Sequence, residues 1–223
     1  MQEIVAAREY CNLDGVKTRF DTVADIYDGA VEDTNYLASP HMLLALEQHL
    51  NGAEAPLLDI LDLGCGTGLC GAAFERYARR LVGVDLSTQM LEKARVKDKY
   101  DELWLDDVVS YLSKTSECFD LVTSAGVFAY VNSLQAVLDG CRRVLRPGGR
   151  LLFTVDCHEA EPDVLPSTRS AMMFMHSKFY VAQSLQDAGF ELSTMLAFDE
   201  RLSWRDRIPV PALLVLAIRS RTE

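Results

Sequence analysis

A glycine-rich turn, Asp62-Leu63-Gly64-Cys65-Gly66-Thr67-Gly68, constrains the fold of this chain more than any other feature. The apolar run at residues 57–61 before it predicts a buried strand, and the spacing of apolar residues over 69–77 predicts a helix. A strand that leads through a glycine turn into a helix is the geometry of a nucleotide-binding site. Glycines let the backbone turn sharply against a ligand, and the helix N-terminus points free N–H groups at it.

The turn fits one kind of nucleotide better than another. A dinucleotide fingerprint can be read at Gly66, Gly68 and Gly71, but the first glycine after the strand is Gly64, so the tight turn is one residue shorter. No lysine or arginine lies in this stretch, although backbone N–H groups alone can hold a pyrophosphate. The acid Asp62 is better placed to meet a cation than a phosphate. S-adenosylmethionine carries a sulfonium and an ammonium group and no phosphate, so it is the favoured ligand.

The turn resembles motif I of the class I S-adenosylmethionine-dependent methyltransferases. The likeness continues along the chain and is closest to a bacterial group of predicted methyltransferases that sometimes carry TPR repeats, an array this sequence lacks; it rests on residues 63–71, 83–87, 100–103 and 176–177. The resemblance implies one α/β domain over residues 1–223. An N-terminal helical lid (1–55) would precede a Rossmann-like, doubly wound, seven-stranded core (56–223) with strand order 3-2-1-4-5-7-6 and strand 7 antiparallel.

The charge of the chain bears on its partners. The formal net charge is -11, and an acidic surface repels nucleic acid and anionic lipid. The longest apolar run, residues 212–218, is too short to span a bilayer. We therefore expect a small-molecule acceptor, with no nucleic acid or membrane partner and no metal.

The cysteines and the first residues bear on location. Residues 1–10 show no apolar signal-peptide region, and no Cys-x-x-Cys pair occurs. We expect reduced, buried thiols in a cytoplasmic protein. The six cysteines are Cys11, Cys65, Cys70, Cys118, Cys141 and Cys157.

An acid at the end of the second predicted strand has the spacing of a ribose-binding carboxylate. Asp85 follows the strand over residues 80–84 and lies about 20 residues beyond the glycine turn. The alternative is an acid that only favours the N-terminus of the next helix, which Ser87 would cap. The resemblance implies that Leu86 and Met90 pack near the adenine edge.

Two further strand ends carry expected cofactor contacts. The resemblance implies that Asp106 or Asp107, with Asp106 slightly preferred, accepts a hydrogen bond from the adenine amino group, and that the next backbone N–H, at Val108, reaches the ring. A helix cap is the alternative role for these acids. Ser124 and Ala125, at the end of the fourth strand, would let the methionine end approach.

The N-terminal segment is expected to form the lid. Residues 20, 23, 24 and 27 recur on one helix face, and Ser39-Pro40 has the sequence of a helix start. Asn51-Gly52 is expected to end that helix. The resemblance implies that Tyr27 and Tyr36 close over the cofactor; packing alone is the alternative for both.

The candidate catalytic residue is His176, in a connection over 156–177 that we expect to be a loop above the site. Its alternative is a helix-terminal histidine without a catalytic part, and His158 is a second candidate. Tyr130 faces either substrate or core. In the resembled group an arginine stands where this chain has Met173, which implies a different substrate or no activity.

The remaining elements follow from local patterns. Asn132 is expected to cap the helix that follows it, and Gly189 to close a helix over 177–188. The expected later strands cover residues 100–105, 119–124, 151–155, 190–198 and 211–219.

Three functions remain open. The first is methyl transfer from S-adenosylmethionine to a small molecule by in-line displacement. The second is a non-catalytic protein that binds S-adenosylmethionine or a partner. The third, a nicotinamide-dependent oxidoreductase, is the least favoured, because Tyr100 and Tyr180 are not followed four residues later by lysine.

Overall fold

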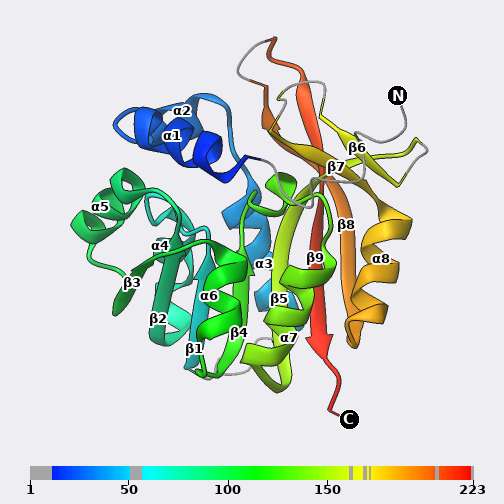
Figure 1. The fold of residues 1–223 in the computed structure, drawn as a ribbon. Helices are drawn as coiled ribbons and strands as arrows, with labels where there is room; N and C mark the ends of the chain where they lie inside the picture. Colours follow the sequence, from blue (N-terminus) through cyan, green and yellow to red (C-terminus); the bar gives the residue numbers. More distant parts are fainter. Residues whose placement is uncertain are drawn as a thin grey trace.

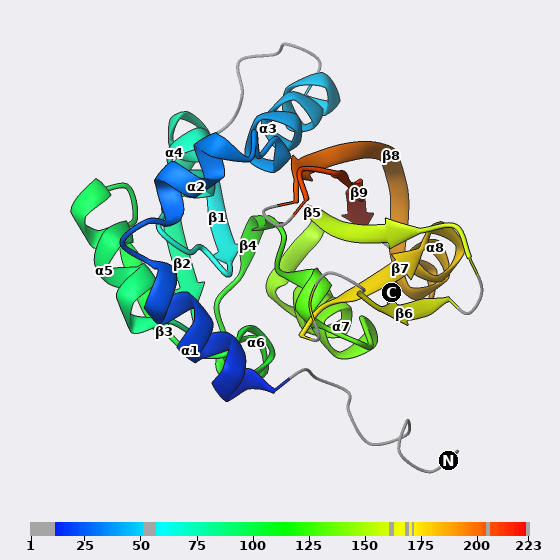
Figure 2. The ribbon, with the colours of Figure 1, turned by 90° about the horizontal axis from the view of Figure 1, so that it is seen from above.

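A computed structural model describes residues 12–50, 57–160, 163–167, 170, 172–203 and 206–221. Its centre is a sheet in which helices cover both faces, as Figures 1 and 2 show. The main strands are β1 (Leu58–Leu63), β2 (Ala78–Asp85), β3 (Glu102–Leu105), β4 (Phe119–Ser124), β5 (Leu145–His158), β8 (Phe190–Leu202) and β9 (Pro209–Arg219).

The strand order is β3-β2-β1-β4-β5-β9-β8. The first five strands pair in parallel, whereas β9 pairs antiparallel with both β5 and β8. Counted without the small hairpin described below, this is the predicted 3-2-1-4-5-7-6 order with strand 7 antiparallel. The prediction of a Rossmann-like doubly wound sheet is therefore confirmed. Parallel strands bring their carboxyl ends to one edge, which is where such sheets bind ligands.

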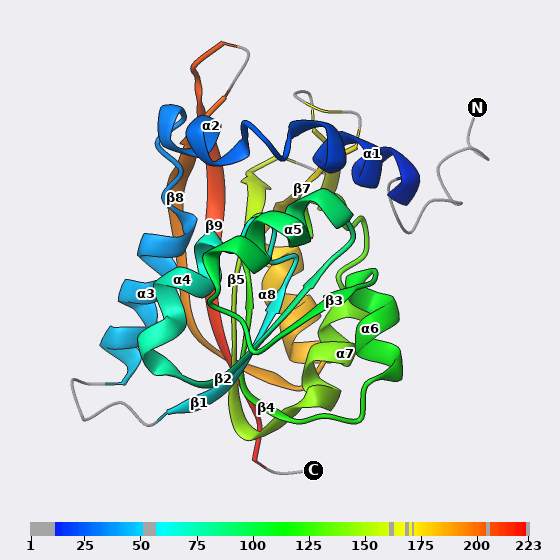
Figure 3. The same ribbon diagram turned by 90° about the vertical axis from the view of Figure 1, so that its left-hand side faces the viewer.

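Each face of the sheet buries its own apolar core. Helices α3 (Ala38–His49) and α4 (Leu69–Phe74) pack on one face with α5 (Thr88–Lys97) beside them, and α6 (Val108–Lys114), α7 (Gln135–Val144) and α8 (Lys178–Asp187) pack on the other (Figure 3). The short 3₁₀ helices are η1 (Glu75–Tyr77) and η2 (Phe128–Tyr130). The near-continuous burial of β1 and β4 follows from this double coverage.

Two short helices, α1 (Leu13–Val23) and α2 (Tyr27–Asp33), lie across the carboxyl ends of the strands (Figures 1 and 3). The prediction of a single helix is wrong here, because a turn between Val23 and Tyr27 separates α1 from α2. The start of the next helix also differs: Leu37, not Ser39, occupies the cap of α3. The predicted end at Asn51-Gly52 lies outside the described residues.

The connection over 156–177 contains a hairpin where a loop was expected. Strand β6 (Val164–Pro166) pairs antiparallel with β7 (Phe174–Ser177), which pairs in parallel with the end of β5. The expected cap at Asn132 is also wrong. Helix α7 begins at Gln135, and the backbone N–H of Leu134 donates instead to the Tyr180 hydroxyl at 3.0 Å.

Other local predictions agree with the structure. Ser87 caps α5 by accepting from the N–H of Met90, and Gly189 closes α8 with a φ of +76°. The five described cysteines are free thiols, but Cys118 is exposed rather than buried as expected, and Cys11 lies outside the described residues. Among the residues that the structure describes, no helix is both long and apolar enough to cross a membrane.

Candidate functional site

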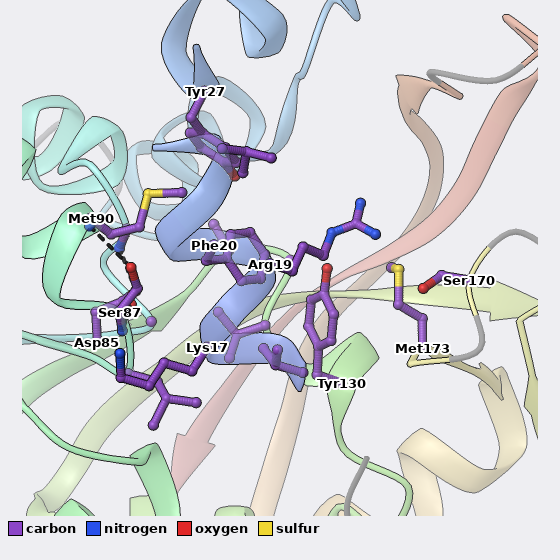
Figure 4. Close-up of a pocket in the computed structure, with 18 of the residues that line it drawn as sticks. Lys17, Arg19, Phe20, Tyr27, Asp85, Ser87, Met90, Tyr130, Ser170 and Met173 are labelled. Atoms are coloured by element: carbon purple, nitrogen blue, oxygen red, sulfur yellow. Dashed lines mark hydrogen bonds between the residues drawn. The ribbon is translucent and has the colours of Figure 1, made fainter. Parts of the chain in front are cut away.

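A cavity of about 350 Å³ lies beneath α1 and α2 at the carboxyl ends of β1, β2 and β4. Figure 4 shows the α1 residues Lys17, Arg19 and Phe20 above it. Asp85 and Met90 lie on one side. Of the predicted residues, Tyr27, Tyr36, Gly64, Gly66, Asp85, Leu86, Met90, Asp107, Val108 and Ala125 line this cavity, and so does Tyr130.

The glycine turn supplies the floor of the cavity. Gly64, Gly66 and Gly68 have φ angles of +68°, +54° and +89°, which side chains rarely adopt. A Cβ on Gly64 would lie 2.2 Å from a Val127 methyl carbon, whereas a Cβ on Gly66 would meet no atom within 4 Å. The turn thus packs closely against the β4 loop at Gly64 and leaves open space at Gly66.

Asp85 is the carboxylate that faces this open space. Its Oδ2 accepts the N–H of Gly66 at 2.8 Å, and its Oδ1 accepts the N–H of Ser87 at 2.8 Å. Burial raises the pKa of Asp85 to about 6, although both backbone hydrogen bonds oppose the shift. Each oxygen keeps a lone pair for a further donor. Asp85 can therefore accept two hydroxyl groups from one side of a ligand.

The predicted residue Asp62 lies behind the glycine turn and does not line the cavity. Its Oδ2 accepts from the Tyr100 hydroxyl at 2.6 Å and its Oδ1 from the Thr123 hydroxyl at 3.0 Å. Burial raises the pKa of Asp62 to about 6, against these two hydrogen bonds. Tyr100 also accepts the N–H of Gly71 at 3.1 Å, so this group holds α4 under the turn rather than meeting a ligand.

Three more predicted residues do not line the cavity. Cys65 is buried. Ser124 donates its hydroxyl to the carbonyl of Leu63 at 3.1 Å. Asp106 pairs with Lys114 at 3.1 Å outside the cavity. Asp107 lines the cavity instead, while its Oδ1 caps α6, so the preference for Asp106 over Asp107 is not supported by their positions.

Hydrogen bonds and ion pairs fasten the lid to the core. Asp21 Oδ1 accepts from the Ser87 hydroxyl at 2.6 Å and from the Gln89 N–H at 3.2 Å. Asp28 accepts from the Thr67 hydroxyl and pairs with Lys97 at 2.6 Å. Asp21 and Asp28 are seven residues apart, so they would share one helix face if the segment were a single helix. Because α1 and α2 are separate helices, each instead has its own anchor to the core.

Aromatic rings complete the underside of the lid. Phe20 meets Tyr27 edge-on with ring centroids 6.1 Å apart and Tyr130 at 5.6 Å. Tyr36, on the linker between α2 and α3, also lines the cavity, and burial raises its pKa well above the usual value. The phenol of Tyr36 is therefore a neutral hydrogen-bonding group at neutral pH.

The far end of the cavity contains residues that the sequence pattern did not reveal. Arg201 lines the cavity, and its guanidinium pairs with Asp156 and Glu200. Ser170 also lines the cavity, and so does Met173, which the sequence analysis had singled out because the resembled group has an arginine there (Figure 4). The predicted strand ended at Phe198, so Glu200 and Arg201 fell in an expected linker. The only signal in the sequence for this part of the cavity was a glutamate and an arginine just after the predicted strand.

His176 does not line the cavity and is fully buried. Its ring stacks on Tyr180 with centroids 5.6 Å apart, and its Nε2 lies 3.4 Å from the carbonyl oxygen of Asn132. Burial lowers the pKa of His176 to about 4. Its position gives no support to the expected catalytic role. His158 also does not line the cavity, and its ring contacts the backbone of its own loop.

Comparison with known proteins gives a consistent result. Residues 61–153 match the family model of a methyltransferase domain. The ubiquinone biosynthesis O-methyltransferase of Rattus norvegicus mitochondria is 31% identical over 122 residues, which cover 51% of this chain and 35% of that protein. The enzyme of the same name from Actinobacillus pleuropneumoniae is 24% identical over 179 residues, covering 77% of this chain and 72% of that protein.

Solved structures share the fold over nearly the whole chain. Magnesium protoporphyrin IX methyltransferase from Synechocystis PCC 6803, with bound S-adenosylhomocysteine, superposes with a TM-score of 0.70 at 15% identity, covering 93% of this chain and 99% of that one. 1,6-Didemethyltoxoflavin-N1-methyltransferase from Burkholderia thailandensis superposes with a TM-score of 0.68 at 20% identity, covering 93% of this chain and 89% of that one. The chain thus has the Rossmann-like methyltransferase fold. Its matched region spans about a third of the Rattus norvegicus relative and just under three quarters of the Actinobacillus pleuropneumoniae relative.

Proposed function

We propose that this chain transfers a methyl group from S-adenosylmethionine to a small-molecule acceptor. The observation that carries the proposal is the shared cavity of Asp85 and the glycine turn. The matched methyltransferase model and the solved structures with bound S-adenosylmethionine or S-adenosylhomocysteine support the same function. The finer likeness to the bacterial group that sometimes carries TPR repeats, and a cytoplasmic location, remain predictions from the sequence.

The cavity fits this cofactor on structural grounds. Gly66 leaves space that a side chain would narrow, and Asp85 offers acceptors beside it. The glycine turn contributes no cationic side chain to the cavity, in keeping with a cofactor that lacks phosphate. The lining combines apolar surface with a few polar groups, as is usual for small-molecule sites.

Residues along the cavity can be assigned to parts of the cofactor. Asp85 would accept the ribose hydroxyls, since a carboxylate can take both. Leu86 and Met90 would pack against adenine, with Asp107 and the N–H of Val108 at its edge. The methionine end would lie near the turn, at positions whose backbone or phenol groups face the cavity: Tyr27, Tyr36, Gly64, Gly66 and Ala125.

The chain's part in the reaction is orientation and exclusion of water. When bound, the cofactor supplies a methyl group already activated by its sulfonium. The α1 and α2 helices cover the site from solvent, and Phe20, Tyr130 and Met173 would orient an acceptor by apolar contact. Holding two reactants in line accounts for much of the rate acceleration in such displacements.

The cavity also limits the acceptor. Among the described lining residues there is no histidine, and the carboxylates are Asp85 and Asp107, both at the end assigned to the cofactor. A base is needed only when the acceptor atom carries a proton of high pKa. We therefore propose an acceptor whose reacting atom is ionised, or carries a free lone pair, near neutral pH.

The test is transfer of labelled methyl from S-adenosylmethionine to a panel of phenols, carboxylates, amines and thiols. Formation of S-adenosylhomocysteine in step with a methylated product supports the proposal, and acceptors ionised at the assay pH should react faster than matched compounds that are not. Binding of the cofactor without turnover across the panel would favour a non-catalytic role.

A further inference from the structure

One guanidinium in the cavity wall has no part in the mechanism above. Arg201, on β8, lines the cavity, and its side chain is 17% exposed. It donates to both Asp156 oxygens, Nη1 to Oδ1 at 3.2 Å and Nη2 to Oδ2 at 3.1 Å, and Nη1 also donates to Glu200. Asp156 and Glu200 are buried and do not line the cavity themselves. Paired bonds of this kind fix the plane of a guanidinium, so Arg201 has a set orientation at the wall.

This guanidinium can still bind a ligand. An arginine has five N–H donors, and the bonds just described use three of them. Burial lowers the pKa of Arg201, but the charges of Asp156 and Glu200 outweigh burial and raise the pKa above its ordinary value. The two carboxyl groups thus keep the guanidinium charged and in place. A charged donor at a mostly apolar cavity forms its strongest hydrogen bonds with an anion.

The charged lining residues are unevenly distributed along the cavity. The carboxylates Asp85 and Asp107 lie at the end assigned to the cofactor. Figure 4 shows Lys17 on the side of Asp85 and Arg19 on the side of Tyr130. Arg19 is exposed, and its guanidinium pairs with no carboxylate in the described part of the chain. Away from the cofactor end, the described lining therefore contains arginine side chains and no carboxylate.

The strand order places Arg201 on the side that the acceptor must occupy. The groups assigned to the cofactor stand at the ends of β1 to β4, and the sheet continues from β4 through β5 and β9 to β8. Asp156, which holds Arg201, is on β5, two strand spacings or about 10 Å from β1. In an in-line displacement the acceptor lies on the far side of the methyl group from the sulfur. The space next to β5 is therefore left for the acceptor.

We propose that Arg201, assisted by Arg19 on the lid, forms a subsite for the carboxylate of an acidic acceptor. The inference rests on the proposed function and narrows its substrate class. A guanidinium fork matches the two oxygens of a carboxylate. A single negative charge fits better than the double charge of a phosphate, because Asp156 adjoins the guanidinium and repels further charge. Phe20 and Tyr130 would contact the apolar part of the acceptor.

The test measures whether the protein prefers a carboxylate to its uncharged amide. Benzoate, phenylacetate and hexanoate, each with the matching amide, are titrated into protein saturated with S-adenosylhomocysteine, and dissociation constants are measured by calorimetry. Arg201→Lys keeps a positive charge for Asp156 and removes the planar fork. Arg19→Gln removes the charge on the lid. The control is Arg95→Gln, which makes the same change in net charge at an exposed position of α5 outside this cavity.

In the wild type we expect carboxylates to bind about tenfold or more tightly than their amides, the size of one hydrogen bond to a charged group. Arg201→Lys should reduce this preference about tenfold, and Arg19→Gln about threefold because that side chain is exposed to solvent. Arg95→Gln should leave the preference unchanged. A panel in which no carboxylate binds more tightly than its amide overturns the subsite, and so does a preference that neither cavity variant alters.

A second arm separates the acceptor's carboxylate from that of the cofactor. S-adenosylhomocysteine and 5′-methylthioadenosine, which lacks the amino-acid end, are titrated into the wild type and Arg201→Lys. Equal changes for the two ligands support the proposal, whereas a selective loss of S-adenosylhomocysteine shows that Arg201 binds the cofactor and overturns it. Wild type that binds neither contradicts the proposed function instead. If Arg201→Lys does not fold, Arg19→Gln, at an exposed side chain without a carboxylate partner, carries both comparisons.

Discussion

The two ends of the cavity are built in different ways. At the end near Asp85, each wall is a strand end and the turn that follows it, so the groups that face the ligand are neighbours in sequence. At the end near Arg201, the walls come from β8, β9, the connection between β6 and β7, and the α2–α3 linker, which lie far apart in the chain. Local motifs determine the first end, and long-range strand pairing determines the second.

The two ends also bury their carboxylates differently. Asp85 receives backbone N–H groups and no cation, which leaves its acceptors directed at a ligand. Asp156 and Glu200 share one guanidinium. The first arrangement suits hydroxyl donors, whereas in the second the residue that lines the cavity is Arg201. Changes at the Asp85 end should therefore affect every ligand that carries the adenosine group.

The largest expected effect comes from removing the Asp85 carboxylate. Asp85→Ala should weaken S-adenosylhomocysteine binding by about a hundredfold or more, because two hydrogen bonds to a charged group are lost. Asp106→Ala, in the neighbouring turn but paired with Lys114, should change binding less than threefold. Calorimetry measures both. Equal losses would show that the variants act through the fold of this edge rather than through ligand contact.

Next comes a pair of glycine substitutions in the same turn. Gly64→Ala places a Cβ against Val127 and should destabilise the fold by about 3 kcal/mol or more, from positive-φ strain plus overpacking. In Gly66→Ala the new Cβ meets no atom within 4 Å, so the free energy of unfolding should fall by only about 1 kcal/mol. The added methyl group should narrow the cavity and weaken ligand binding. Denaturant unfolding separates the two. Adding Val127→Ala should restore part of the stability lost in Gly64→Ala only.

The pH dependence of binding distinguishes Asp85 from Asp62. Ligand affinity should be highest above pH 6 and fall up to about tenfold per unit below it, because only the ionised Asp85 accepts both hydroxyls. The folding stability of the free protein changes with pH in the opposite direction. Because the pKa of Asp85 is raised in the folded state, its contribution to the free energy of unfolding is complete below the ordinary pKa of a carboxyl group and is lost as the pH rises through about 6. Calorimetry from pH 5 to 8 should show the affinity slope in Asp62→Asn but not in Asp85→Asn. A slope that follows Asp62 would reverse the assignment.

A smaller effect is expected at the lid. Asp21→Ala removes the contacts to Ser87 and Gln89 and should speed release of S-adenosylhomocysteine about threefold to tenfold, as the loss of one or two hydrogen bonds implies. Asp25→Ala, which removes an exposed pair with Lys93, serves as the matched control and should leave release unchanged. Stopped-flow displacement measures both rates. Identical rates in the two variants would exclude this anchor.

The smallest expected effect on turnover is at His176. Because its side chain is buried outside the cavity, His176→Gln should lower the melting temperature and leave kcat/KM within about threefold once an acceptor is known. A loss of a hundredfold in kcat with unchanged stability would restore the catalytic hypothesis from the sequence. Activity and thermal melting of the same preparation decide between them.

The contrast explains what could be predicted from the sequence. The place of Asp85 follows from strand length and the spacing to the glycine turn, both local properties. Asp62 stands at an equivalent strand end, but Tyr100 and Thr123 occupy its oxygens, and no pattern near residue 62 reveals those partners. The sheet order was predictable by resemblance, because the motifs follow one another in a fixed sequence along the chain.

Long-range contacts explain what was missed. Glu200 and Arg201 look like loop residues, and only the extension of β8 beside β9 makes them cavity wall. Asn132 has the residue type of a helix cap, yet Tyr180 from α8 takes the backbone group nearby. The hairpin exists because β7 adds to the end of β5, a pairing with no local signal.

The central claim is that the cavity between the glycine turn and Asp85 holds S-adenosylmethionine. The most direct measurement is calorimetric titration of the wild type with S-adenosylhomocysteine, NADH and NADPH in parallel. We expect one site that binds S-adenosylhomocysteine and neither nicotinamide. Binding of NADH or NADPH alone would contradict the claim and every assignment along the cavity, and binding of none of the three would leave the site without its proposed ligand.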